Sequence, residues 1–148
     1  MTAPSWIETV RGLTAEATFS PGATDHRLSE AEARLAIAVP SDLRLLLSET
    51  DGIRGQYELG LVWPLARIVE DNLMFRSNPE FRELYMPFDG LLFFADAGNG
   101  DQFAYSVAGG QVRRPDIFVW NHEDDSRNWV APDLRTYLDW WLSGKLKV

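Results

Sequence analysis

The chain has 148 residues, 45% of them hydrophobic, which is enough for one domain that builds its own core without a stabilising metal. It contains no cysteine, which excludes thiol nucleophiles, cysteine-ligated metals and a disulfide scaffold and predicts a cytoplasmic location. Its 22 acidic and 14 basic side chains give a net charge of -8, which argues against nucleic acid as a partner and favours a basic protein.

No segment indicates contact with a membrane. The longest uninterrupted apolar run, Leu91–Ala95, is far shorter than the ~20 residues that cross a bilayer. Residues 1–12 lack the charged-then-apolar pattern of a leader. We therefore expect a chain without a leader or a membrane span.

Amphipathic spacing dominates the first part of the chain. Apolar residues three and four apart predict a short helix over residues 5–13. Ser29 followed by Glu32 has the pattern of a capping box, which predicts that a second helix begins there and runs to about Ala38. Pro40 should end this helix.

The pattern changes in the middle of the chain. A third predicted helix begins at Asp42 and stops at Asp51-Gly52, because glycine tolerates the left-handed backbone of a helix end. The aliphatic and aromatic run 57–63 favours a strand that is broken at Pro64. Residues 65–74 have helical spacing with Met74 on the inward side, and 76–87 reads as a loop with one helical turn.

Three strand-like runs follow in quick succession, at residues 91–95, 102–107 and 117–121. Their separators, 96–101 and the region of Gly109-Gly110, are short and rich in turn residues, so the runs should pair as an antiparallel meander.

The final element is an amphipathic helix that Pro132 can open and Gly144 can stop. Its apolar stripe consists of Leu134, Tyr137, Leu138, Trp141 and Leu142. Helices, then a sheet, then a helix is the order of an α+β fold. We predict a single domain with a mainly antiparallel sheet of about four to six strands flanked by helices.

The order of these landmarks resembles the SUKH superfamily, which contains a yeast cell-wall synthesis regulator and many bacterial immunity proteins. The resemblance covers residues 28–144 and rests on the following runs: Ile37–Leu43, Leu46-Leu47, Asp51-Gly52, Leu91–Ala95, Gly98–Asp101, Phe103–Tyr105, Ile117–Glu123 and Leu134–Leu142. It divides the chain into an N-terminal helix and loop, 1–27, and a SUKH-like domain, 28–148, packed as one unit.

The resemblance implies a non-enzymatic domain without a cofactor. Such domains commonly neutralise a toxin encoded beside them, often a nuclease. Two alternatives stay open: a regulatory or scaffold protein that binds endogenous partners, and a carboxylate-based, metal-dependent hydrolase. The oligomeric state is left open.

Two acidic turns could carry chemistry. The turn 96–101 has carboxylates and glycines, but Gly98 and Gly100 occupy positions where a calcium-binding loop needs side-chain oxygens, so a hairpin turn is favoured. In the run 122–125 one imidazole and three carboxylates could hold a divalent metal, serve as an acidic patch that faces a partner, or form a solvated turn, which we favour.

The chain has six tryptophans, and large aromatic side chains dominate both cores and interface hot spots. Trp63 and Trp120 lie in strand-like runs and should be core. Trp129 lies in a polar stretch and Trp140 lies off the apolar stripe, so each is either covered by another element or exposed as an anchor. The predicted partner-binding residues are Asp96, Asp101, Glu123, Asp124, Asp125, Trp129 and Trp140.

Overall fold

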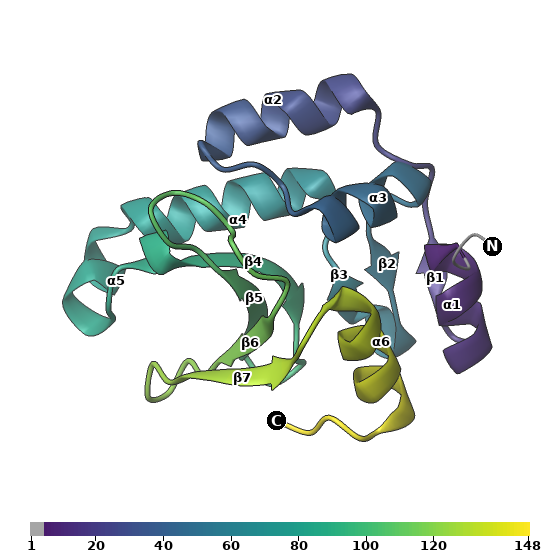
Figure 1. Ribbon diagram of the computed structural model, residues 1–148. Helices are drawn as coiled ribbons and strands as arrows, with labels where there is room; N and C mark the ends of the chain where they lie inside the picture. The colour runs from purple at the N-terminus through teal and green to yellow at the C-terminus, as the bar shows by residue number, and fades with distance from the viewer. Residues whose placement is uncertain (1–4) are drawn as a thin grey trace.

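A computed structural model describes residues 5–148, so the first four residues of the segment 1–27 lie outside the described part. The α-helices are α1 (Trp6–Leu13), α2 (Asp25–Leu35), α3 (Ser41–Glu49), α4 (Leu65–Ser77), α5 (Pro79–Leu84) and α6 (Leu134–Ser143), with 3-10 turns η1 (Gln56–Glu58) and η2 (Phe88–Gly90) (Figure 1). None of the described helices is both long and apolar enough to cross a bilayer.

The strands form two antiparallel sheets. The smaller contains β1 (Thr18–Phe19), β2 (Ile53–Arg54) and β3 (Gly60–Val62), and the larger contains β4 (Leu91–Asp96), β5 (Gln102–Ser106), β6 (Ile117–Trp120) and β7 (Arg127–Ala131), each in sequence order. The amide of Trp63 donates to the carbonyl of Phe94 at 2.7 Å and joins the two sheets. The predicted α+β class and antiparallel meander are confirmed, with the strands divided between two sheets.

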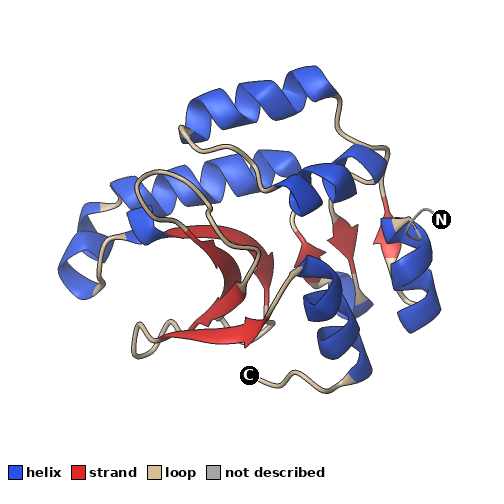
Figure 2. Cartoon of the chain, viewed as in Figure 1, coloured by secondary structure: helices blue, strands red, loops and turns tan. Residues whose placement is uncertain are grey.

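The larger sheet is strongly curved, and helices cover it on two sides (Figure 2). Phe93 and Phe94 are consecutive in β4, so their side chains point to opposite faces. Phe93 contacts Phe75 of α4 and Trp120 of β6, whereas Phe94 contacts Tyr137 of α6. Both faces of β4 are therefore buried. Trp63 and Trp120 are also buried, which confirms the prediction that they belong to the core.

A buried amide holds an irregularity in β4. The pairing register with β5 shifts between Phe93 and Ala95. The side chain of Asn72 in α4 accepts a hydrogen bond from the Phe93 amide (2.8 Å) and donates one to the Phe93 carbonyl (2.9 Å). Asn72 therefore occupies the place of a neighbouring strand and fixes α4 to the sheet.

The predicted capping box was wrong. Thr24 caps α2 by accepting a hydrogen bond from the Arg27 amide (3.2 Å), so Ser29 lies inside the helix. The helix ends at Leu35, and the next residue, Ala36, has a left-handed backbone. Glu32 instead turns toward the next segment, accepting the Val39 amide at 2.7 Å. A local pattern cannot distinguish these two uses of the same carboxylate.

Two further expectations need correction, one for a helix face and one for a helix start. Met74 is exposed, because the buried side of α4 runs through Val69, Asn72 and Phe75. Helix α6 begins after Asp133, whose side chain caps the Thr136 amide, so Pro132 lies outside the helix.

At its C-terminus α6 ends at Gly144 in the left-handed region, as predicted. Trp141 is half-buried against Phe103, with ring centroids 5.2 Å apart, and Trp140 is half-buried beside Trp129. The two tryptophans therefore differ in their neighbours.

The N-terminal helix is attached through Trp6. The backbone amide of Trp6 donates to the carboxylate of Glu49 in α3 at 3.0 Å. The guanidinium of Arg135 in α6 lies over the Trp6 ring, 3.9 Å from its centroid. These contacts connect α1 to both helices.

Candidate partner-binding surface

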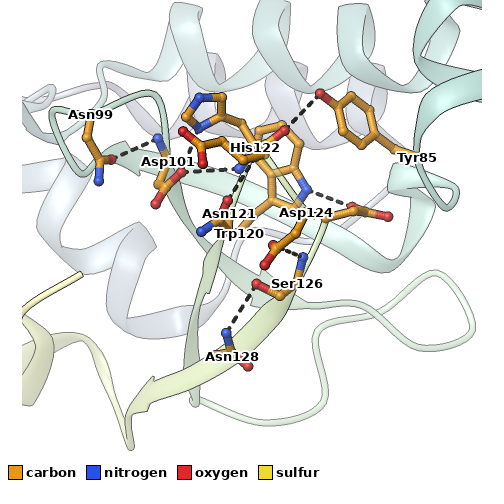
Figure 3. A network of polar contacts seen from close by, with 11 residues as sticks. Tyr85, Asn99, Asp101, Trp120, Asn121, His122, Asp124, Ser126 and Asn128 are labelled. Carbon is orange, nitrogen blue, oxygen red and sulfur yellow. Dashed lines mark hydrogen bonds and ion pairs between the residues drawn. The ribbon is translucent and has the colours of Figure 1, made fainter.

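Two turns meet at one end of the larger sheet: the β4–β5 turn, 96–101, and the β6–β7 turn, 121–126 (Figure 3). The buried carboxylate of Asp101 accepts the backbone amide of His122 at 3.1 Å and lies 2.7 Å from its Nδ1. Asp101 therefore joins the two turns across 21 residues of sequence.

The β4–β5 turn is a tight hairpin that requires glycine. Gly98 and Gly100 both have positive φ, at 93° and 96°. A Cβ on Gly100 would also lie 2.7 Å from Cε1 of His122. The hairpin interpretation of 96–101 therefore agrees with the backbone.

Asp96 is directed toward α4 and away from the turn. Its two carboxylate oxygens accept hydrogen bonds from Arg67 at 2.8 and 3.0 Å, and the Arg67 guanidinium lies over the Trp63 ring at 4.1 Å. Burial by itself would lower the pKa of Arg67, but hydrogen bonds and charges from Asp96 and Asp71 outweigh it and raise that pKa. The charge of Asp96 is thus balanced inside the fold.

Asp125 connects three segments of the chain. Its backbone is left-handed (φ 60°), and its carboxylate accepts from the Trp120 indole (2.7 Å), the Met86 amide (2.9 Å) and Arg127 (3.1 Å). Burial alone would raise the pKa of Asp125, but these three hydrogen bonds and the Arg127 charge lower it. Asp125 is therefore held as a carboxylate by structural partners.

Two carboxylates of the same turn face solvent. Asp124 accepts the Ser126 amide at 2.9 Å, and this hydrogen bond lowers its pKa. Glu123 is exposed, and no other described residue pairs with its carboxylate. Of the run 122–125, Glu123 and Asp124 therefore present negative charge outward.

An exposed apolar segment lies against this turn. Leu84 is 70% exposed and Met86 is 63% exposed, at the end of α5. Between them, the Tyr85 hydroxyl donates to the carbonyl of His122 at 3.0 Å, while Arg127 donates to the Met86 carbonyl at 2.9 Å. We define Leu84, Met86, Glu123 and Asp124 as the apolar–acidic surface.

A pocket opens beside Met86. It has a volume of about 420 Å³, and its lining combines aromatic rings with three charged side chains. Its lining consists of Phe75, Arg76, Phe81, Arg82, Tyr85, Met86, Pro87, Phe88 and Asp89. Burial lowers the pKa of Arg76, which donates to main-chain carbonyls of Leu35 and Leu91 (both 3.3 Å). The pocket has the size and lining to receive one large apolar side chain.

Sequence reasoning missed this segment, because 76–87 reads as a polar loop. The available signal was Leu84 and Met86 themselves, two large apolar residues outside any amphipathic stripe.

Trp129 in β7 and Trp140 in α6 form a separate aromatic contact. Trp129 is opposite Phe118 in the β6–β7 pairing, away from the turn, and its ring centroid lies 6.4 Å from that of Trp140. Its indole donates to Asp116 at 3.0 Å, and this bond and Arg114 lower the pKa of Asp116.

Comparison with known families explains this arrangement of elements. A family model described as SMI1-KNR4 cell-wall, within the SUKH group (SUKH_6), matches residues 25–138. The chain belongs to the SUKH superfamily. The match spans α2 to α6 and includes both turns, the apolar–acidic surface and Trp129. A comparison with curated proteins gave no match.

In this SUKH domain the seven predicted partner-binding residues occupy different environments. Asp96, Asp101 and Asp125 bind other parts of the chain, Glu123 and Asp124 face outward, and Trp129 and Trp140 form a separate pair. Within residues 5–148, no three or more histidine and acidic side chains gather where they could hold a metal ion. Partner binding by any of the seven stays a prediction.

Proposed function

We propose that this SUKH-type protein is a non-enzymatic immunity protein that neutralises a cognate nuclease toxin by covering its basic surface. The observation that carries the proposal is the apolar–acidic surface together with the aromatic-walled pocket that Met86 lines. The segment that carries Met86 is held against the turn that presents Glu123 and Asp124. Exposed apolar patches with polar rims are typical of protein-binding sites.

The two parts of the surface have different roles in the proposed complex. A nuclease presents cationic groups to its phosphate substrate, and carboxylates on an inhibitor attract them and raise the association rate. Burial of apolar side chains then slows dissociation. Glu123 and Asp124 supply the first effect, and Leu84, Met86 and the pocket supply the second.

The surface is ordered by contacts within the chain. Tyr85 is bonded to the carbonyl of His122, and the amide of Met86 is bonded to Asp125. A partner that binds here spends little free energy on ordering these groups, which favours affinity.

In this proposal the chain covers the basic surface of the toxin and catalyses no reaction itself. Asp96, Asp101 and Asp125, three carboxylates of the two acidic turns that a hydrolase could have used, each bind a neighbouring element of the fold. This engagement supports a structural role for them.

The direct test uses the protein encoded by the adjacent gene. We expect it to carry a nuclease, to bind the full chain at equal stoichiometry and to lose nucleic-acid cleavage on binding. Glu123→Lys with Asp124→Lys should slow association and reduce its salt dependence, while Leu84→Ala with Met86→Ala should speed dissociation.

The matched control is Glu16→Lys with Glu30→Lys, which changes the net charge equally at exposed positions outside the surface. Inhibition that survives both variants of the surface would refute its assignment. An adjacent gene product without toxin activity would favour the regulatory or scaffold alternative, and metal-dependent hydrolysis by the purified chain would favour the hydrolase.

A further inference from the structure

A second pocket lies on the larger sheet beside Trp129. It has a volume of about 380 Å³, and its lining includes Ser106, Arg113, Arg114, Asp116, Phe118 and Trp129. Phe118 and Trp129 are opposite each other in neighbouring strands, so their side chains lie on the same face of the sheet. This pocket belongs neither to the two acidic turns nor to the apolar–acidic surface.

The aromatic wall of this pocket is held in place although it faces solvent. Trp129 is 51% exposed, yet its indole is bonded to Asp116 and its ring contacts Trp140 at the edge of the sheet. Strand β7 and α6 lie side by side there (Figure 1). An exposed tryptophan in one fixed orientation has the property of an interface anchor.

The charged residues that line the pocket are two arginines and one aspartate, so its net charge is positive. Arg113 donates to the Ala108 carbonyl (3.1 Å), and no carboxylate within residues 5–148 pairs with it. Arg114 is bonded to Asp116 through Nε (2.7 Å), while the rest of its guanidinium is exposed. Lys145 and Lys147, the only lysines of the chain, follow the end of the helix that carries Trp140.

We propose that this pocket binds an acidic peptide segment that inserts one large apolar side chain between Phe118 and Trp129. The carboxylates that flank the inserted residue pair with Arg113 and Arg114. Planar guanidinium groups suit carboxylates because they offer paired donors, and the apolar walls suit an aromatic or branched side chain.

A peptide fits this site better than a nucleic acid does. Bases could stack on Trp129, but a nucleic acid has no apolar side chain to insert between Phe118 and Trp129. An acidic peptide can insert one and place its carboxylates next to the arginines. The site is also opposite in sign to the apolar–acidic surface, so the two surfaces fit different partners.

The test titrates the full chain with the peptide Asp-Glu-Phe-Asp-Glu, capped at both ends, and follows the indole and amide signals by NMR. We expect saturable binding that shifts the Trp129 indole signal and weakens with added salt. Trp129→Ala and Arg113→Glu should each weaken binding roughly tenfold or more, as for hot-spot residues. Replacing Phe by Ala in the peptide should do the same.

The matched controls are Tyr57→Ala, which removes a 92% exposed ring elsewhere, and Arg34→Glu, which reverses an exposed charge on α2. Both should bind the peptide like the unmodified chain. The proposal is overturned if Trp129→Ala, with an unchanged circular dichroism spectrum, binds normally, if a peptide with Lys in place of the acids binds equally well, or if a short oligothymidylate binds more tightly. None of these outcomes depends on the proposed immunity function, because the apolar–acidic surface stays intact in every variant.

Discussion

Asp101 and His122 connect the two turns at the end of the larger sheet. One carboxylate oxygen of Asp101 lies 3.1 Å from the backbone nitrogen of His122 and 2.7 Å from its Nδ1. The Tyr85 hydroxyl donates to the carbonyl of the same His122. Through this pair, the stability of the fold and the shape of the apolar–acidic surface are coupled.

Removal of the Asp101 carboxylate should therefore destabilise the fold. Asp101→Ala leaves the His122 amide without its acceptor, and hydrogen bonds to charged groups contribute about 1.5–3 kcal/mol each. We expect a loss of about 2 kcal/mol in the free energy of unfolding, measured by urea denaturation. The control is Asp139→Ala, at an exposed site on α6. An equal urea midpoint for the two variants would contradict the structural role of Asp101.

Gly100 should tolerate no side chain. Gly100→Ala places a methyl group 2.7 Å from the His122 ring at a φ of 96°, so it combines a steric clash with backbone strain. We expect a destabilisation of about 2–3 kcal/mol. Gly110→Ala has positive φ but open space around its Cβ, and it should cost about 1 kcal/mol. Equal thermal shifts for the two variants would show that the contact with His122 is unimportant.

Asn72 should be a main determinant of stability. Asn72→Ala leaves both the amide and the carbonyl of Phe93 unpaired in the core, where each such group costs about 1–3 kcal/mol. We expect a loss of about 2–4 kcal/mol in chemical denaturation. Asn128→Ala, which removes an exposed amide side chain from β7, should change stability little. If Asn72→Ala also changed the free energy of unfolding only slightly, water would be replacing the Asn72 side chain as the partner of the Phe93 backbone.

Stability should fall in acid in part through Asp125. Its native pKa is lowered, so at low pH the unfolded chain binds a proton more readily than the folded chain. The contribution is complete above the ordinary aspartate pKa of about 4 and is lost as the pH falls through the lower native value. Asp125→Asn should be less stable at neutral pH and show a flatter decline in acid, in urea midpoints measured across pH. A parallel decline in both proteins would assign the acid sensitivity to other groups.

Patterns with a local cause were predictable. The hairpin turn at Gly98 and Gly100, the meander of β4–β6 and the end of α6 at Gly144 follow from backbone preferences and from spacing within one element. Strands β1 and β2 were missed because two residues are too few to show alternation, and β7 was missed because most of its residues are polar or exposed.

The sequence by itself determined the α+β class, the main helices and the meander of β4–β6, because hydrophobic spacing and glycines act over a few residues. The tertiary structure decided which carboxylates face outward: Asp96 pairs with Arg67 and Asp101 accepts the amide of His122, whereas Glu123 stays exposed. It also decided that Leu84 and Met86 lie on the surface beside an acidic turn. These relationships join residues 21 to 39 positions apart, and spacing within one element carries no information about them.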